Sequence, residues 1–167
     1  AVDIIDADVD LSAYRLVIAP MLYMVRDGFA ERAEAFVANG GHLVTTYWTG
    51  IVNESDLCYL GGFPGPLRKL LGIWAEEIDC LNDGERNLVQ GLAGNEGGLQ
   101  GPYQVRHLCE LIHAETAQPL ATYRDDFYAG RPAVTVNHVG KGKAWHVASR
   151  NDLAFQRDFF SAISKEL

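Results

Sequence analysis

A nucleophilic hydrolase would place Ser or Cys on the sharp turn that follows a buried strand. In this chain the natural position follows Thr45-Thr46-Tyr47, but the turn reads Trp48-Thr49-Gly50-Ile51 and contains neither residue type. None of the three cysteines lies between paired glycines. We therefore predict no nucleophilic catalysis by this chain.

Paired carboxylates are the other chemistry to weigh, because glycoside hydrolysis usually needs two of them flanking the scissile bond. Asn53-Glu54 and Asn95-Glu96 each form the Asn-Glu dipeptide that carries the acid/base in many barrel glycosidases. Both pairs fall in expected loops, and a (β/α)₈ barrel needs about 250 residues. With 167 residues the chain is too short for one, so we predict no catalytic residue.

Metal and phosphate sites are also not expected. His107, Cys109 and His113 lie close together, but a structural zinc site needs a fourth ligand and tighter paired spacing. The acidic run 6–10 begins like a calcium loop but lacks the later Gly and Glu that such a loop requires. The run 140–143 lacks the spacing of a phosphate loop. We predict no metal and no cofactor.

Composition excludes several broad classes. The residues are 48% hydrophobic and 22% charged, as in a globular protein, and the length fits one domain covering 1–167. The net charge of −8, with no basic run, argues against nucleic acid and against an anionic membrane surface. No apolar run reaches the roughly 18 residues of a membrane span. Three cysteines without framework spacing fit a reducing, cytoplasmic compartment.

The first third of the chain predicts a β-α-β unit. Leu16–Ala19 is a continuous apolar run, typical of a strand buried on both faces. Residues 28–39 have the apolar spacing of a helix, and Gly40-Gly41 supplies its stop. His42–Tyr47 is the next strand, and the crossover should be right-handed.

Further elements make the chain an α/β protein. We expect strands at 2–5, 73–81, 88–92, 118–123, 133–138 and 143–148, a short helix at 66–71, and a last helix through Lys165 capped by Asn151 or Asp152. The segment 103–114 fits either a helix or a strand.

Two loops are unusually apolar. The first, Trp48–Pro66, contributes the candidates Trp48, Tyr59, Phe63 and Pro64, and the second contributes Phe127, Tyr128 and Arg131. Large exposed apolar groups of this kind would mark an interface, whereas buried ones would belong to the domain's own core. We expect the seven to be interface residues, with private packing as the alternative.

Four phrases are distinctive together: Asp10-Leu-Ser-Ala-Tyr-Arg-Leu-Val-Ile-Ala-Pro-Met-Leu-Tyr23, Gly50-Ile-Val-Asn-Glu-Ser-Asp-Leu57, Gly61-Gly-Phe-Pro-Gly-Pro-Leu-Arg68 and Asp126-Phe-Tyr-Ala-Gly-Arg-Pro-Ala-Val134. From about residue 2 to 148 the chain resembles the middle, or trimerisation, domain of the glycoside hydrolase family 42 β-galactosidases. The resemblance implies a class I glutamine amidotransferase-like fold, a flavodoxin-like three-layer sandwich with a mostly parallel central sheet.

The resemblance also implies a function. In the family the two catalytic glutamates belong to a preceding barrel domain, so no catalytic residue is carried over to this chain. We expect a non-catalytic oligomerisation domain of a retaining β-galactosidase, in contact with that barrel and with neighbouring subunits of a homotrimer. The alternatives are a free-standing amidotransferase-like hydrolase, and a sugar-binding module that uses Trp48, Tyr59 or Trp145 as a stacking platform.

One departure from the family concerns the start of the chain. The family's domain normally begins with a further strand and helix before the segment matching 2–5. The chain opens Ala-Val-Asp-Ile-Ile without Met. We therefore expect it to be cut from a longer protein and to lack that first strand and helix, which would leave a gap beside Leu16–Ala19.

Overall fold

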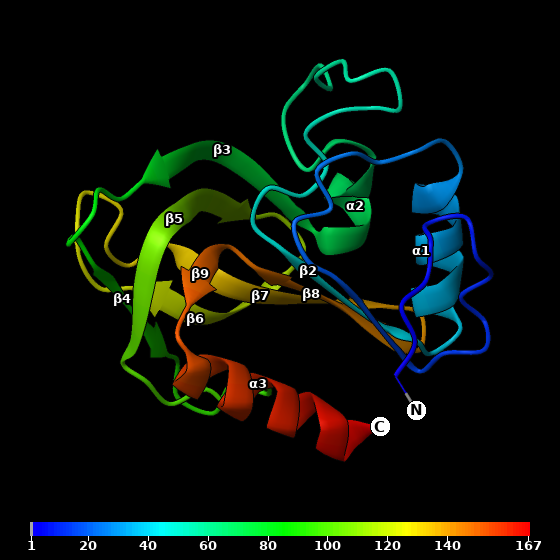
Figure 1. Cartoon of the computed structure of the whole chain (residues 1–167). Coiled ribbons are helices and arrows are strands. Elements are labelled where there is room, and N and C mark those ends of the chain that lie inside the picture. Colours follow the sequence, from blue (N-terminus) through cyan, green and yellow to red (C-terminus); the bar gives the residue numbers. More distant parts are fainter. Residues whose placement is uncertain (1) are drawn as a thin grey trace.

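The computed structural model describes residues 2–167 as one mixed sheet flanked by helices (Figure 1). Its elements are β1 (Leu16–Ala19), α1 (Phe29–Ala38), β2 (His42–Thr46), a 3₁₀ turn (Gly65–Leu67), α2 (Arg68–Leu71), β3 (Ile73–Cys80), β4 (Asn87–Gly91), β5 (Tyr103–Ala114), β6 (Gln118–Tyr123), β7 (Pro132–Val139), β8 (Gly142–Val147), β9 (Ser149–Asn151) and α3 (Leu153–Glu166). The α/β class is confirmed.

The predicted β-α-β unit is present. β1 pairs with β2 in parallel from Leu16 opposite His42, and β2 pairs with β8 in parallel. Helix α1 crosses between β1 and β2 and buries Phe29, Ala33, Phe36 and Val37. These four are the apolar residues at helical spacing, so periodicity alone placed the buried face correctly.

The rest of the sheet is antiparallel, and the expectation of a mostly parallel sheet is wrong. The strand order is β1-β2-β8-β7-β6-β4-β5-β3, and only the β1–β2 and β2–β8 pairs are parallel. Short connections account for the antiparallel pairs β6–β7 and β7–β8, because a hairpin returns the chain antiparallel, whereas a parallel pair needs a long crossover. β9 continues β8 and pairs with β5, so the antiparallel strands curl back on themselves.

The core has two parts, one on each face of the sheet. α1 and α2 cover one cluster, which includes Phe36, Leu43 and Ile112. α3 covers the other, which includes Val44, Trp145 and Phe159. Successive residues Leu43 and Val44 point to opposite faces, as the strand period requires. Figure 1 shows α3 on the side of the sheet opposite α2, so the expected three layers are present.

Three expectations about single segments are settled. Residues 2–5 form no strand. Val2 and Ile4 are fully exposed, Asp3 accepts from the Tyr14 hydroxyl, and Ile5 packs against the core cluster that α1 covers. The ambiguous segment 103–114 is a strand, β5, which pairs with β3, β4 and β9. Within the described residues β1 pairs only with β2 and is therefore an edge strand.

Candidate functional site

The loops that follow β1 and β2 meet at the carboxyl ends of these strands. Backbone hydrogen bonds join them: Gly50 N donates to Leu22 O at 2.8 Å, and Ile51 N donates to Tyr23 O at 2.9 Å. The tip of the loop after β2 exposes Leu57 and Leu60, and beside the strand ends the two loops expose four more large apolar side chains, Met21, Tyr23, Met24 and Trp48. We call these four the Trp48 surface. The rings of Tyr23 and Trp48 lie 6.3 Å apart, so the two loops present one joint aromatic surface.

Trp48 occupies the turn where a nucleophile would sit, and its backbone is unusual. Its φ of 60° lies in the left-handed region, which bulky side chains rarely adopt. Trp48 N donates to Glu110 Oε1 at 2.6 Å, and Glu110 Oε2 lies 2.9 Å from His146 Nε2. Both side chains of this pair are only 2% exposed. The backbone of the Trp48 turn is thus held in an unfavourable conformation next to the buried side chains of Glu110 and His146.

This arrangement has the acid and the histidine of a hydrolase but no nucleophile. Trp48 carries an indole, and His146 Nδ1 lies 2.9 Å from Thr45 Oγ1, so both ring nitrogens already have partners. Glu110 is committed to the Trp48 amide and to His146. The pair can fix the position of the turn but has no free group for proton transfer.

The seven interface candidates divide by exposure. Trp48 is 36% exposed and Phe127 is 72% exposed. Tyr59, Phe63 and Arg131 are partly buried, and Pro64 and Tyr128 are buried. The exposed tip of the first loop consists instead of Leu57 and Leu60, of which Leu60 is fully exposed.

Tyr128 was expected at the interface, and the structure places its side chain in the core instead. Its hydroxyl donates to Asp79 Oδ2 at 2.7 Å, and its ring meets Tyr123 edge-on at 5.0 Å. Burial is the main reason why the pKa of Tyr128 is raised, followed by its hydrogen bond to Asp79. The loop pattern was misleading because the adjacent aromatics at 127 and 128 differ in burial: the Phe127 ring is exposed and covers the buried Tyr128 ring edge-on at 5.0 Å.

Arg131 is held by a polar network next to its own loop. It donates to Glu76 Oε2 at 2.9 Å, and His113 Nε2 lies 2.7 Å from the same oxygen. These two hydrogen bonds, that of His113 first, hold the pKa of Glu76 below its usual value. The ring of His113 stacks on Trp74 at 4.8 Å. Arg131 therefore already has an intramolecular partner.

The two Asn-Glu pairs do not come together as a catalytic dyad. Glu96 binds Lys143 and lies 2.7 Å from His138 Nε2. Burial opposes ionisation of Glu96, but the hydrogen bonds from Lys143 and His138 outweigh it and lower its pKa. Glu54 is exposed in the first loop. Glu96 is therefore an ion-pair partner of Lys143, and Glu54 is a solvent-exposed side chain.

His107, Cys109 and His113, which were not expected to form a zinc site, have different environments in the structure. His107 is exposed at a β5 irregularity with φ of 68°, Cys109 is buried, and His113 stacks on Trp74. Across residues 2–167 there is no group of three or more His, Cys, Asp or Glu side chains arranged to hold a metal. Burial raises the pKa of the Cys109 thiol to about 11.

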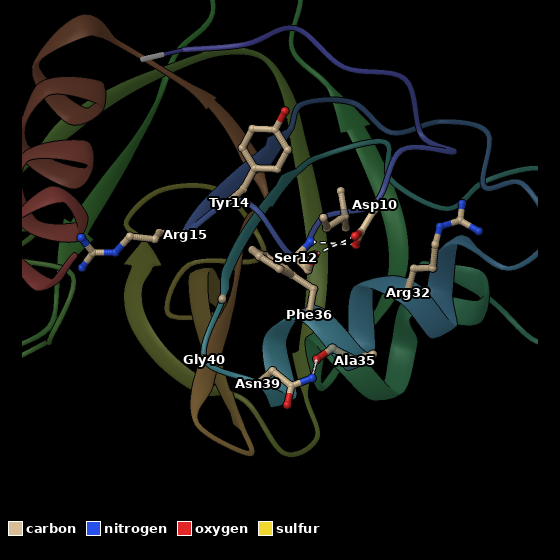
Figure 2. A pocket seen from close by; sticks show the side chains of 11 residues that line it. Asp10, Ser12, Tyr14, Arg15, Arg32, Ala35, Phe36, Asn39 and Gly40 are labelled. Carbon is tan, nitrogen blue, oxygen red and sulfur yellow. Dashed lines mark hydrogen bonds between the residues drawn. The ribbon is translucent and has the colours of Figure 1, made fainter.

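A surface hollow of about 480 Å³ lies between the segment before β1 and the end of α1. Figure 2 shows Asp10 bonded to Ser12 and Arg15 directed away from them. Arg32, at its rim, donates to Ala7 O at 2.8 Å. Asp10, Ser12 and one guanidinium nitrogen of Arg32 thus bond within the chain, whereas Arg32 Nε has no partner among residues 2–167. Because Arg15 is directed away from Asp10 and Ser12, the polar side chains around the hollow do not converge on one ligand position.

Sequence reasoning located the Trp48 turn but missed Glu110 and His146. The available signal was a charged residue inside the apolar run Cys109–Ile112 and a histidine between Trp145 and Val147. Buried Glu is rare unless paired, so each residue implied a partner. The sequence did not identify that partner, which lies 36 positions away. Trp145 is fully buried and cannot serve as a sugar platform.

Comparison with known proteins gives a consistent picture. The family model described as "Beta-galactosidase trimerisation domain" matches residues 1–167. Beta-galactosidase BglY of Alicyclobacillus acidocaldarius is 58% identical over 98% of this chain, and Beta-galactosidase Pbg of Clostridium perfringens is 56% identical over 99%. The chain spans 24% of the length of each.

Solved structures agree. The crystal structure of the β-galactosidase from Rahnella sp. R3 superposes with a TM-score of 0.98 at 66% identity, over 99% of this chain and 24% of that one. The β-galactosidase from Bacillus circulans sp. alkalophilus superposes with a TM-score of 0.93 at 50% identity, over 96% and 24%. Among residues 2–167, no helix is long and apolar enough to cross a membrane.

Proposed function

We propose a function for this chain from its family: it belongs to the β-galactosidase trimerisation domain family of glycoside hydrolase family 42. The chain is the non-catalytic part of a longer enzyme and holds three copies of that enzyme together. The observation that carries the proposal is the match of the family over the whole chain, combined with a strand-end turn that has no nucleophile. The longer enzyme is a retaining hydrolase of terminal β-galactosides, acting in the cytoplasm.

The catalytic carboxylates of that enzyme lie in another domain, a barrel. Two features of this chain support that division. Its one deeply buried glutamate, among the residues described, is tied to His146 and the Trp48 amide. Glu96 is committed to Lys143 and His138. Retaining hydrolysis requires two carboxyl groups about 5–5.5 Å apart on either side of the glycosidic bond. Neither of these glutamates is free to take such a position.

The contact surfaces are the two apolar loops. Trp48, Leu57 and Leu60 on the first loop and Phe127 on the second are large, exposed and apolar. Aromatic anchors of this kind dominate the energy of protein interfaces. They face the barrel domain and the neighbouring copies in the assembled enzyme.

The test compares this chain with the full-length enzyme that carries it. We expect the purified chain to leave a chromogenic β-galactoside intact under conditions where the full-length enzyme hydrolyses it. Sedimentation should give a trimer for the full-length enzyme and a smaller species when the exposed loop residues Leu57, Leu60 and Phe127 are replaced by Ser. Turnover by the isolated chain, or a trimer that survives these three substitutions, would contradict the proposal.

A further inference from the structure

The backbone of Trp48 is held in a conformation that it would not adopt by itself. At φ of 60° an L-residue brings its Cβ close to a carbonyl oxygen, a strain that persists only where the surroundings impose it. Such strain is concentrated at functional positions of proteins. Glycine would fit this position without strain, yet the chain has its largest side chain there.

The buried Glu110–His146 pair is the side-chain group that binds the amide of Trp48 itself, while Thr49 Oγ1 donates to Thr46 O and Gly50 N donates to Leu22 O around it. Glu110 accepts from the Trp48 amide at 2.6 Å and lies 2.9 Å from His146, which in turn lies 2.9 Å from Thr45 Oγ1 on β2. Both members are 2% exposed. A buried, hydrogen-bonded polar pair contributes little net stability compared with apolar residues of the same shape, because desolvation of the polar groups offsets their attraction. Stability of the fold therefore does not account for the pair, whereas positioning of the turn does.

The side chain that results is an exposed indole on an apolar surface. Trp48 is flanked by Tyr23, with Met21 and Met24 also exposed on the same pair of loops. Two polar groups of these loops have partners within the chain: Thr46 Oγ1 accepts from the Met21 amide, and the Tyr59 hydroxyl donates to Val25 O. The four side chains of the Trp48 surface are two methionines, a tyrosine and a tryptophan, and none of them is charged at neutral pH. A surface of this composition suits an apolar protein partner, because aromatic residues and Met are enriched and charged residues depleted at the core of protein interfaces.

We infer that Glu110 and His146 are positioning residues that fix the Trp48 indole as an anchor for a second copy of the full-length enzyme. The inference rests on the proposed function, and the choice of a second copy follows from the family's description as a trimerisation domain. Glu110 and His146 do not touch that second copy. They act through the Trp48 backbone.

The first variant tests the anchor itself. Trp48→Gly removes the indole and places at φ of 60° the residue that accepts it best. The melting temperature of the 167-residue chain should therefore stay the same or rise. The dissociation constant of the full-length trimer should rise at least tenfold. If the trimer is unchanged, the Trp48 surface is not a subunit contact, and this part of the proposed function fails together with the inference.

The second set of variants tests the positioning pair. Glu110→Leu combined with His146→Phe replaces both polar partners with apolar ones and keeps the site filled, so the chain should still fold. We expect the trimer to weaken about as much as with Trp48→Gly. Glu110→Gln is the matched control, since its amide oxygen can accept from Trp48 N and its amide nitrogen can donate to His146. That variant should retain the trimer. If the folded double variant assembles like the wild type while Trp48→Gly does not, the inference is overturned and the proposed function stands.

A milder variant and a spectroscopic measurement cover the case in which the double variant does not fold. Thr45→Val removes the hydroxyl beside His146 Nδ1 and keeps the shape of the side chain. In the 167-residue chain labelled with 5-fluorotryptophan there are three tryptophans, and the Trp48 resonance is identified by its loss in Trp48→Gly. We expect Thr45→Val to shift or broaden that ¹⁹F resonance without moving the Trp74 resonance. An unchanged Trp48 resonance, with unchanged assembly of the full-length Thr45→Val enzyme, overturns the inference.

Discussion

Burial decides which of the three thiols can react. Cys109 is fully buried on β5, and burial raises its pKa to about 11, so the reactive thiolate is scarce near neutral pH. Cys58 and Cys80 are exposed. Cys109 was considered as a zinc ligand because of its spacing to His107 and His113, but its side chain belongs to the apolar core.

We therefore expect two thiols of the native 167-residue chain to react rapidly with a chromogenic disulfide reagent at pH 8, and the third only after denaturation. Cys109→Ala should leave the number of fast thiols at two, while Cys80→Ser should reduce it to one. Rapid reaction of all three thiols in the folded chain would show that the β5 region opens readily, contrary to the burial of Cys109.

Elements are held in place by a few side chains at their ends. Asp152 precedes α3 and accepts from Phe155 N at 2.9 Å through Oδ1, while its Oδ2 accepts from Gln104 N at 2.9 Å. One carboxylate thus caps the helix and joins it to the start of β5. The sequence predicted a cap at Asn151 or Asp152, but the second bond depends on the sheet and was not predictable locally.

We expect Asp152→Ala to lower the free energy of unfolding by about 1–2 kcal/mol, the usual cost of losing such a cap. Chemical denaturation of the 167-residue chain provides the measurement. Ser161→Ala, on the exposed face of the same helix, is the matched control and should stay within about 0.5 kcal/mol of the wild type. Equal stability of wild type and Asp152→Ala would mean that solvent satisfies these amides equally well.

Local pattern predicted the elements better than their pairing. The β1-α1-β2 unit was correct because apolar runs and the Gly40-Gly41 stop are local signals. Segment 103–114 stayed ambiguous because its apolar residues fit both periods, and only pairing with three other strands makes it β5. The resemblance to a parallel sandwich did not indicate that β4 to β7 run antiparallel, since the direction of a strand depends on partners distant in sequence.

In the candidate site, too, the local features could be predicted and the contacts between distant segments could not. The position of the turn at Trp48 could be predicted, because it follows a buried strand. Glu110 and His146 could not be placed beneath it, since β5 and β8 are not neighbours in the strand order and meet there only through the curl of the sheet. The exposure of adjacent aromatics was also not predictable: Phe127 points to solvent and Tyr128 to the core.

The arrangement of the apolar loops over the whole domain bears on how it assembles. A closed ring of three copies uses head-to-tail contacts, so each copy must offer two different surfaces. Figure 1 shows the loop between β2 and α2 and the loop between β6 and β7 at separate places on the molecule. Exposed apolar residues on both loops therefore suit a ring better than a two-fold dimer, which would use one surface twice.

Phe127 and Tyr128 give the sharpest test of this arrangement, because they are adjacent in sequence and opposite in environment. Phe127 is 72% exposed, so Phe127→Ala should lower the free energy of unfolding of the 167-residue chain by less than about 1 kcal/mol. In the full-length enzyme the same change should weaken the trimer, as measured by sedimentation over a dilution series. Tyr128→Ala removes a buried ring and its bond to Asp79 and should cost about 3–5 kcal/mol in the chain itself. If Phe127→Ala leaves the trimer unaffected at every dilution, the β6–β7 loop takes no part in the contact, and the proposal that the two apolar loops are the contact surfaces fails for this loop.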